Sequence, residues 1–148
     1  MLSQRFRRLF PFALVVLLAR AAYAIPVAPP GYEWRYVARA VDTSRKAHFA
    51  IEYPKEHSPW RDDVVHMVPP KYPYADRSAH RSGKGLYRLS LDVSTGAVTN
   101  VRIVRSTGSE TLDQAAIEAL RQWAIRPEKW LELDIPIEFR MSPPPLRR

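Results

Sequence analysis

The sequence of 148 residues contains no cysteine and only five glycines, against 14 prolines. Without cysteine the chain forms no disulfide, holds no metal through thiolates and uses no thiol nucleophile. The sequence also has no internal repeat, long charge block or low-complexity tract. These absences exclude disulfide scaffolds, thiol enzymes and repeat proteins, and the length fits one ordinary domain with extensions.

Motifs typical of enzymes and metal proteins are missing as well. The four histidines have no helical metal-ligand spacing: they are His48, His57, His66 and His80. Ser106 and Ser109 lack the Gly-x-Ser-x-Gly context of a nucleophile, and Gly83-x-Gly85 is too short for a phosphate loop. We therefore expect no enzyme activity, no cofactor and no metal. A hydrolase stays open as an alternative, and it would need convergent carboxylates or a serine–histidine pair in a pocket.

The formal net charge of +8 is concentrated partly at the amino terminus. Arg5, Arg7 and Arg8 precede an apolar stretch at residues 9–19, and Ala22-Tyr23-Ala24 supplies small residues at the cleavage-determining positions. This layout predicts a signal peptide over residues 1–24, with a short uncleaved signal anchor as the alternative.

Removal of this segment takes away four arginines and no acid, which leaves 19 basic and 15 acidic residues. The exported chain is therefore only mildly basic, and its charge does not demand nucleic acid as a partner. We expect the protein in the periplasm or, if the anchor remains, at the inner membrane.

Residues 25–68 form the expected linker, in which two alternating runs predict a β-hairpin. Its strands are expected at residues 34–37 and 48–53, with a polar loop at residues 42–46. Residues 55–70 contain charges and prolines and predict an irregular connector. Three roles for the hairpin stay open: covering the sheet, mediating dimerisation, or regulating access to an edge strand.

The expected domain covers residues 69–141, and the tail at residues 142–148 is expected to be disordered. A short helix is predicted at residues 74–81, with Pro73 as its first helical residue and the glycine-containing residues 82–85 ending it. A β-hairpin follows, with strands at residues 87–93 and 98–105. The parity of its apolar residues requires a bulge near Thr99.

The second helix has the clearest pattern in the chain. Its apolar residues recur with a period of 3.6: Leu112, Ala115, Ala116, Ala119, Leu120 and Trp123. Thr111 and Gln114 have the spacing of a capping box, and Pro127 predicts a helix end near Ala124. We expect Asp113 to stabilise the amino end of this helix through the macrodipole.

The last predicted strand, at residues 131–139, has one apolar face and contains Pro136. Because proline cannot donate to a ladder, this strand is expected at an edge of the sheet. If the Pro136 side is free, the amides of Asp134 and Glu138 point outward. The alternating acids predict a solvated face. Such an edge is either blunted by charge and proline or serves as a docking surface, including for a second copy of the chain.

Residues 70–141 resemble the carboxyl-terminal domain of the TonB family. The resemblance rests on Tyr72-Pro73, Ser94-Thr95-Gly96, Ser106-Thr107-Gly108, the series Leu112-Asp113-x-Ala115-Ala116-x-x-Ala119-Leu120-x-x-Trp123-x-x-x-Pro127, and Pro136-Ile137-Glu138-Phe139. It implies an α+β fold with two helices packed on a three-stranded antiparallel sheet, in agreement with the pattern analysis.

The resemblance also implies a function: a periplasmic module that binds an extended segment of outer-membrane transporters by β-strand addition, in TonB-dependent transport. Inner-membrane motor subunits would be partners if the amino terminus stays uncleaved. The expected partner-binding residues are Tyr72, Pro73, Asp134, Ile135, Pro136, Ile137, Glu138 and Phe139.

Two other interpretations stay open. The first is that Tyr72 and Tyr74 pack over an exposed end of the sheet and do not contact a partner. The second is that the protein is an envelope structural or adaptor protein that binds cell-wall polymer through basic residues: Arg102, Arg105, Arg121 and Arg126.

Overall fold

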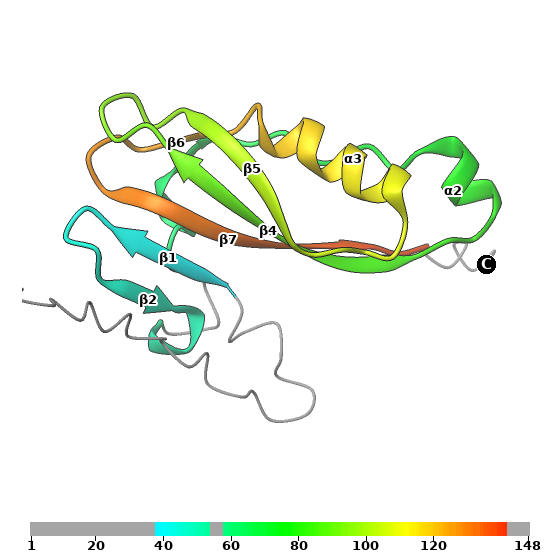
Figure 1. Cartoon of the computed structure of the whole chain (residues 1–148), viewed down its shortest axis with the longest axis horizontal. Helices are drawn as coiled ribbons and strands as arrows, with labels where there is room; N and C mark the ends of the chain where they lie inside the picture. Colours follow the sequence, from blue (N-terminus) through cyan, green and yellow to red (C-terminus); the bar gives the residue numbers. More distant parts are fainter. Residues whose placement is uncertain (1–37, 54–57, 142–148) are drawn as a thin grey trace, which may run out of the picture.

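A computed structural model of the chain describes residues 38–53 and 58–141 (Figure 1). The predicted signal peptide, the expected strand at residues 34–37 and the carboxyl-terminal tail lie outside the described residues.

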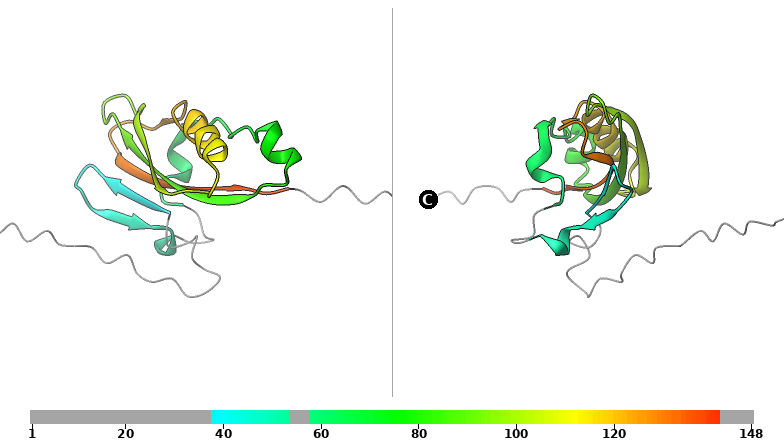
Figure 2. Two further views of the ribbon diagram at one scale, coloured as in Figure 1. Left: turned by 45° about the vertical axis from the view of Figure 1, so that its right-hand side comes forward. Right: turned by 90° about the vertical axis from the view of Figure 1, so that its left-hand side faces the viewer.

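The fold is α+β, with two helices packed on an antiparallel sheet. The central strands are β4 (Gly83–Leu91), β5 (Val98–Arg105) and β7 (Trp130–Phe139). The helices, α2 (Tyr74–Ser78) and α3 (Glu110–Leu120), lie on the same face of this sheet (Figures 1 and 2). The predicted fold class is therefore confirmed.

The sheet has five strands, because an amino-terminal hairpin extends the expected three. Its strands are β1 (Arg39–Asp42) and β2 (Ala47–Phe49), and the strand order is β2-β1-β7-β4-β5. The predicted second strand at residues 48–53 is wrong in its bounds: β2 ends at Phe49, and the 3-10 turn η1 (Ala50–Glu52) follows. The polar loop between the strands is where the sequence predicts it.

The hairpin formed by β4 and β5 is confirmed, including its bulge. Ser90 pairs with Asn100 and Leu91 with Val98, so Thr99 is the extra residue. The turn is closed by Asp92, whose carboxylate accepts the Ser94 amide at 2.8 Å. The resulting strand pair positions the apolar face that packs against α3.

The sequence analysis expects the glycines at residues 83 and 85 to end a helix, but both belong to strand β4. A Cβ at Gly83 would lie 2.4 Å from the Thr107 carbonyl oxygen, and one at Gly85 would lie 2.5 Å from the Tyr87 hydroxyl. Both residues are therefore small because other groups approach the backbone closely. Helix α2 accordingly ends at Ser78, and Pro73 is its N-cap residue and not its first helical residue.

Helix α3 has the predicted apolar face, but both of its expected ends are wrong. The helix ends at Leu120, four residues before Ala124. The capping box does not form, because Thr111 donates its hydroxyl to Asp76 and the Gln114 amide donates to Glu118 at 3.1 Å. No helix in the described ranges is both long and apolar enough to cross a bilayer.

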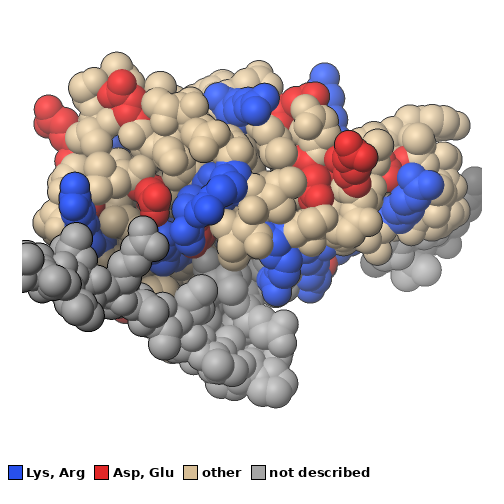
Figure 3. Space-filling model, viewed as in Figure 1, with Lys and Arg blue, Asp and Glu red and all other residues tan. Residues whose placement is uncertain are grey.

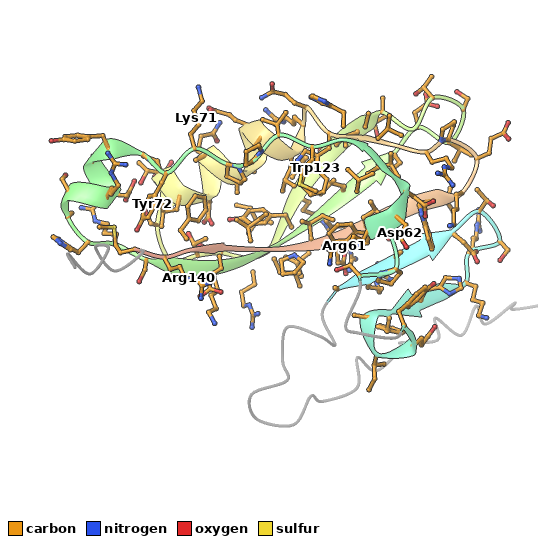
Figure 4. All side chains as sticks on the ribbon, turned by 180° about the vertical axis from the view of Figure 1, so that it is seen from behind. Arg61, Asp62, Lys71, Tyr72, Trp123 and Arg140 are labelled. Atoms are coloured by element: carbon orange, nitrogen blue, oxygen red, sulfur yellow. The ribbon has the colours of Figure 1, made fainter. Side chains whose placement is uncertain are left out.

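The core lies between α3 and the sheet. Trp123, just beyond α3, is 5% exposed and donates its indole N–H to the Val68 carbonyl at 2.9 Å. Figure 4 shows this ring turned into the space between helix and sheet. The fully buried large side chains in this core are Tyr87, Leu89, Leu112, Leu120, Ile125, Leu133 and Ile135.

The stretch expected as an irregular connector contains regular structure. The 3-10 turn η3 (Arg61–Asp63) leads into β3 (Val64–His66), which pairs with β6 (Ala124–Ile125) in a second, two-stranded sheet. Asp63 is 2% exposed and accepts the Trp130 indole N–H at 2.9 Å. The partner strand lies about 60 residues away, so a short Val-Val pair carries no local signal for this pairing.

Candidate functional site: the outer edge of strand β7

Strand β7 pairs with β4 along nearly its whole length. The register runs from Gly83 opposite Phe139 to Ser90 opposite Glu132. On its other side β7 pairs with β1 over its amino-terminal half alone, from Asp42 opposite Trp130 to Arg39 opposite Asp134. Figure 1 shows β1 beside this half of β7, with β2 beyond it.

Among the described residues, the last strand is therefore an edge strand over only half its length, which corrects the sequence expectation. Of the described residues, 135–139 of β7 pair on one side only. We call residues 135–139 the open half and Trp130–Asp134 the covered half. Asp134, whose amide was expected to point outward, lies opposite Arg39, whereas Glu138 lies beyond the end of β1.

Asp134 also does not belong to a solvated strand face. It is 4% exposed, and its carboxylate accepts two hydrogen bonds from Arg88 of β4, at 2.6 and 2.8 Å. Arg39 of β1 donates a third, at 3.1 Å, and also contacts Glu132 at 3.0 Å. Four charged side chains from three adjacent strands thus form one cluster on the sheet face opposite the helices.

This cluster is electrostatically favourable because each buried charge has a partner of opposite sign. The hydrogen bonds to the Asp134 carboxylate raise the pKa of Arg88 above its ordinary value. The geometry with Arg88 is bidentate, which is the strongest form of a carboxylate–guanidinium pair.

The open half keeps its apolar residues in the core and exposes little side-chain charge. Ile135 is 1% exposed and Phe139 is 5% exposed. Pro136 lies opposite Leu86, and Glu138 lies 3.6 Å from the Lys84 ammonium, with both side chains about half exposed. The outward side of this half therefore consists mainly of backbone groups.

Tyr72 and Pro73 lie at the end of the open half. The Tyr72 ring packs edge-on against Phe139 with centroids 5.5 Å apart, and its hydroxyl donates to the Arg81 carbonyl. Figure 4 shows Tyr72 beside the end of β7. Tyr74, by contrast, is 77% exposed. The structure thus brings Tyr72 into contact with the last residue of the expected site and leaves Tyr74 in solvent.

Asp113 lies in the first turn of α3, where the sequence analysis expects it, and its carboxylate also makes hydrogen bonds that the sequence analysis does not predict. Its carboxylate accepts the Tyr87 hydroxyl at 2.7 Å and the Thr107 amide at 2.8 Å, and it also accepts the Ser106 hydroxyl. Burial opposes the charged form, but these hydrogen bonds outweigh it and hold the pKa of Asp113 below its ordinary value. The residue thus ties the loop before α3 to β4.

Asp76 of α2 is a second buried carboxylate, and the sequence analysis does not single it out. It is fully buried and accepts hydrogen bonds from the Thr111 hydroxyl, from Arg81 at 3.2 Å and from Ser109 at 3.2 Å. The Thr111 bond is the main reason why its pKa is lowered. The spacing of 35 residues between Asp76 and Thr111 left no local signal for this contact.

The histidines form no metal centre in the part of the chain that the structure describes. His48 lies 2.8 Å from Asp42 and 3.7 Å from Glu52, and its ring packs edge-on against Trp130. This arrangement holds the hairpin against the first residue of β7.

The basic residues considered for polymer binding come from separate elements. Arg102 and Arg105 lie on β5, Arg121 follows α3, and Arg126 lies 3.4 Å from Asp63. Figure 3 shows the described basic side chains of one face in several groups with acidic side chains between them. This face therefore has no continuous basic surface.

Comparison with known proteins identifies the family of this domain. Residues 68–141, half of the chain, match the family described as Gram-negative bacterial TonB protein C-terminal. The chain belongs to this family. The TonB C-terminal domain thus contains β4, β5, β7 and both helices, while β1, β2 and β3 precede it. Membership agrees with the expectation of an interaction module that is not an enzyme.

The relatives are longer proteins. The chain is 33% identical over 85 residues to Protein TonB of Vibrio cholerae, which covers 53% of this chain and 34% of that protein. It is 28% identical over 86 residues to Protein tonB2 of Pseudomonas aeruginosa, covering 53% of this chain and 31% of the relative. The match therefore spans about a third of the length of these relatives.

Two solution structures are also similar. The Helicobacter pylori TonB C-terminal domain aligns with a TM-score of 0.45 and 27% identity, covering 50% of this chain and 71% of that one. The Pseudomonas aeruginosa TonB C-terminal domain aligns with a TM-score of 0.44 and 18% identity, covering 57% and 88%.

Proposed function

We propose that this TonB C-terminal domain acts in the periplasm as a binding module of TonB-dependent transport. Its partner is an extended segment of an outer-membrane transporter, which adds as a strand to the outer edge of β7. Family membership supports the role in transport, and the one-sided pairing of the open half supports the place of binding.

Main-chain groups supply the affinity in this mode, because strand addition satisfies backbone donors and acceptors that an edge leaves to water. Pro136 provides a carbonyl but no N–H, so Glu138 carries the outward amide of the open half. Tyr72 and Pro73 border this edge at Phe139 and offer the side-chain surface that distinguishes one segment from another.

An amide titration tests this proposal directly. A synthetic peptide with the sequence of the periplasmic amino-terminal segment of a transporter from the same organism is added to the labelled protein. We expect the largest amide shifts at residues 135–140. Shifts confined to other elements, or none at saturating peptide, would contradict it.

A proline variant sharpens the test. Glu138→Pro removes the outward donor and is expected to weaken peptide binding at least about fivefold, since one main-chain hydrogen bond contributes ~1 kcal/mol. Glu138→Gln is the matched control, because it changes the same side chain and keeps the N–H. Equal weakening in both variants would mean that the side chain, and not the backbone edge, binds the peptide.

A further inference from the structure

We propose that the β1–β2 hairpin is an internal competitor for the partner segment. It occupies the covered half of β7, and a segment that pairs along the whole strand must displace it. This inference rests on the proposed function, because it concerns regulation of the same edge. It assigns a role to a part of the chain that precedes the family match.

The pairing of β1 with β7 is itself a strand addition. Arg39, Ala40 and Val41 lie opposite Asp134, Leu133 and Glu132 in antiparallel register. The added strand has four residues, and its neighbour β2 has three. An isolated two-stranded hairpin of this size is at best marginally stable in water, so the edge of β7 holds it in place.

The apolar anchoring of β1 is small. Ala40 is fully buried in the common core, but its side chain is a single methyl group. Ala38 and Ala50 are also buried alanines, and the Ala50 amide bonds to the Ala38 carbonyl within the hairpin region. The large core side chains belong to other elements, so departure of β1 exposes little apolar surface from the hairpin itself.

The charged contacts of β1 are arranged so that release leaves no buried charge without a partner. Arg39 contributes one of the three guanidinium hydrogen bonds to Asp134, and the bidentate pair with Arg88 remains when Arg39 leaves. Glu132, the other partner of Arg39, has a side chain that is 39% exposed and is solvated on release. The large penalty for breaking a buried ion pair therefore does not apply here.

The open half gives an arriving segment a place to begin. Residues 135–139 present a backbone edge next to the end of β1, while the other half is filled by the chain itself. Pairing can start at Glu138 and extend toward Trp130 as β1 leaves. The apparent association constant for a long segment is then the intrinsic one multiplied by the fraction of molecules in which the hairpin is undocked.

A disulfide lock tests this competition. The chain has no cysteine, so Val41→Cys with Glu132→Cys creates a single cross-link between residues that are paired in the register. We expect the oxidised protein to bind the transporter peptide at least tenfold more weakly than the same protein after reduction.

The matched control joins the two strands of the hairpin to each other. Val41→Cys with Ala47→Cys also cross-links a paired position of β1, but it leaves the pairing of β1 with β7 without a cross-link. Its oxidised and reduced forms are expected to bind equally. A difference as large as that of the β1–β7 lock would mean that the cross-link, and not the covered edge, lowers the affinity.

A charge reversal provides a second test that needs no cross-link. Arg39→Glu places a carboxylate beside Asp134 and Glu132 and should release β1. We expect tighter peptide binding and faster amide exchange in residues 39–42. Lys46→Glu makes the same charge change in the turn of the hairpin, at an exposed side chain, and should alter neither.

The outcomes separate the two proposals. If the oxidised and reduced forms of the β1–β7 cysteine variant bind the peptide equally, and Glu138→Pro still weakens binding, the competitor role is wrong and the proposed function stands. If the peptide binds neither of these forms and does not bind the Arg39→Glu variant, both the proposed function and this inference are wrong.

Discussion

The two halves of β7 share one strand and one neighbour, β4, but they differ on their other side. The covered half is paired with the chain's own β1 and presents Asp134 and Glu132 to Arg39. The open half presents Pro136 and Glu138, and β1 does not reach it. We infer that side chains on the sheet face, and not the backbone edge alone, decide where a further strand pairs along β7.

The largest effect is expected from removing the carboxylate at the centre of the charged cluster of the covered half. Asp134→Ala leaves Arg88 largely buried without its bidentate partner and should destabilise the fold by about 3 kcal/mol. Urea unfolding of the purified variant measures this change. Glu132→Gln, at a more exposed partner of Arg39, is the control and should cost less than ~1 kcal/mol. Equal losses in both variants would contradict the buried cluster.

The end of the open half provides the next test. Tyr72→Ala removes the ring that packs on Phe139 and should lower the free energy of unfolding by about 1.5 kcal/mol. Tyr74→Ala, at a residue 77% exposed, should leave it nearly unchanged. If thermal unfolding shows the same stability for both variants, Tyr72 does not support this end of the sheet.

Acid should weaken the contacts that tie α2 and the loop before α3 to the rest of the domain. The pKa values of Asp76 and Asp113 are held below their ordinary values, by the Thr111 hydrogen bond in one case and, against burial, by several hydrogen bonds in the other. The stability that they contribute is present above an unfolded pKa of about 3.9 and is lost as the pH falls through the lower folded values.

The measurement is the pH dependence of unfolding from pH 6 to pH 2. The double variant Asp76→Asn and Asp113→Asn should show a flatter profile than the parent chain. An unchanged slope would mean that other carboxylates carry the acid sensitivity.

The smallest effect on stability is expected from the exposed charge of the open half. Glu138→Gln removes the 3.6 Å contact with Lys84, and since both side chains are about half exposed, the change should be less than ~0.5 kcal/mol. Urea unfolding checks it. A loss above 1 kcal/mol would show that the open half is held by charge in the same way as the covered half.

Much of the fold could be predicted because its signals are local. The period of α3, the turn after β4 and the bulge at Thr99 each follow from residues within about ten positions of one another. The failures arise mainly where a distant residue overrides a local pattern. Thr111 fits a capping box by spacing, but Asp76 competes for its hydroxyl, and the glycines at 83 and 85 resemble a helix stop although close contacts require them.

The candidate site could be predicted only in part. The apolar alternation and Pro136 identified the last strand and its tendency to lie at an edge. They did not reveal that Arg39 reaches Asp134 across 95 positions of the chain, or that Arg88 meets the same carboxylate from β4. An acid that alternates with apolar residues has the same pattern whether it is solvated or paired.

Residue spacing and short motifs are enough to predict most elements of this domain, the apolar faces that build its core and its family. They do not predict which half of β7 is covered, which acids are buried or what the amino-terminal hairpin contacts. Strand pairing depends on backbone groups that every residue carries, so the local sequence does not select the partner strand. Only the packing of distant side chains selects the register in which two strands meet.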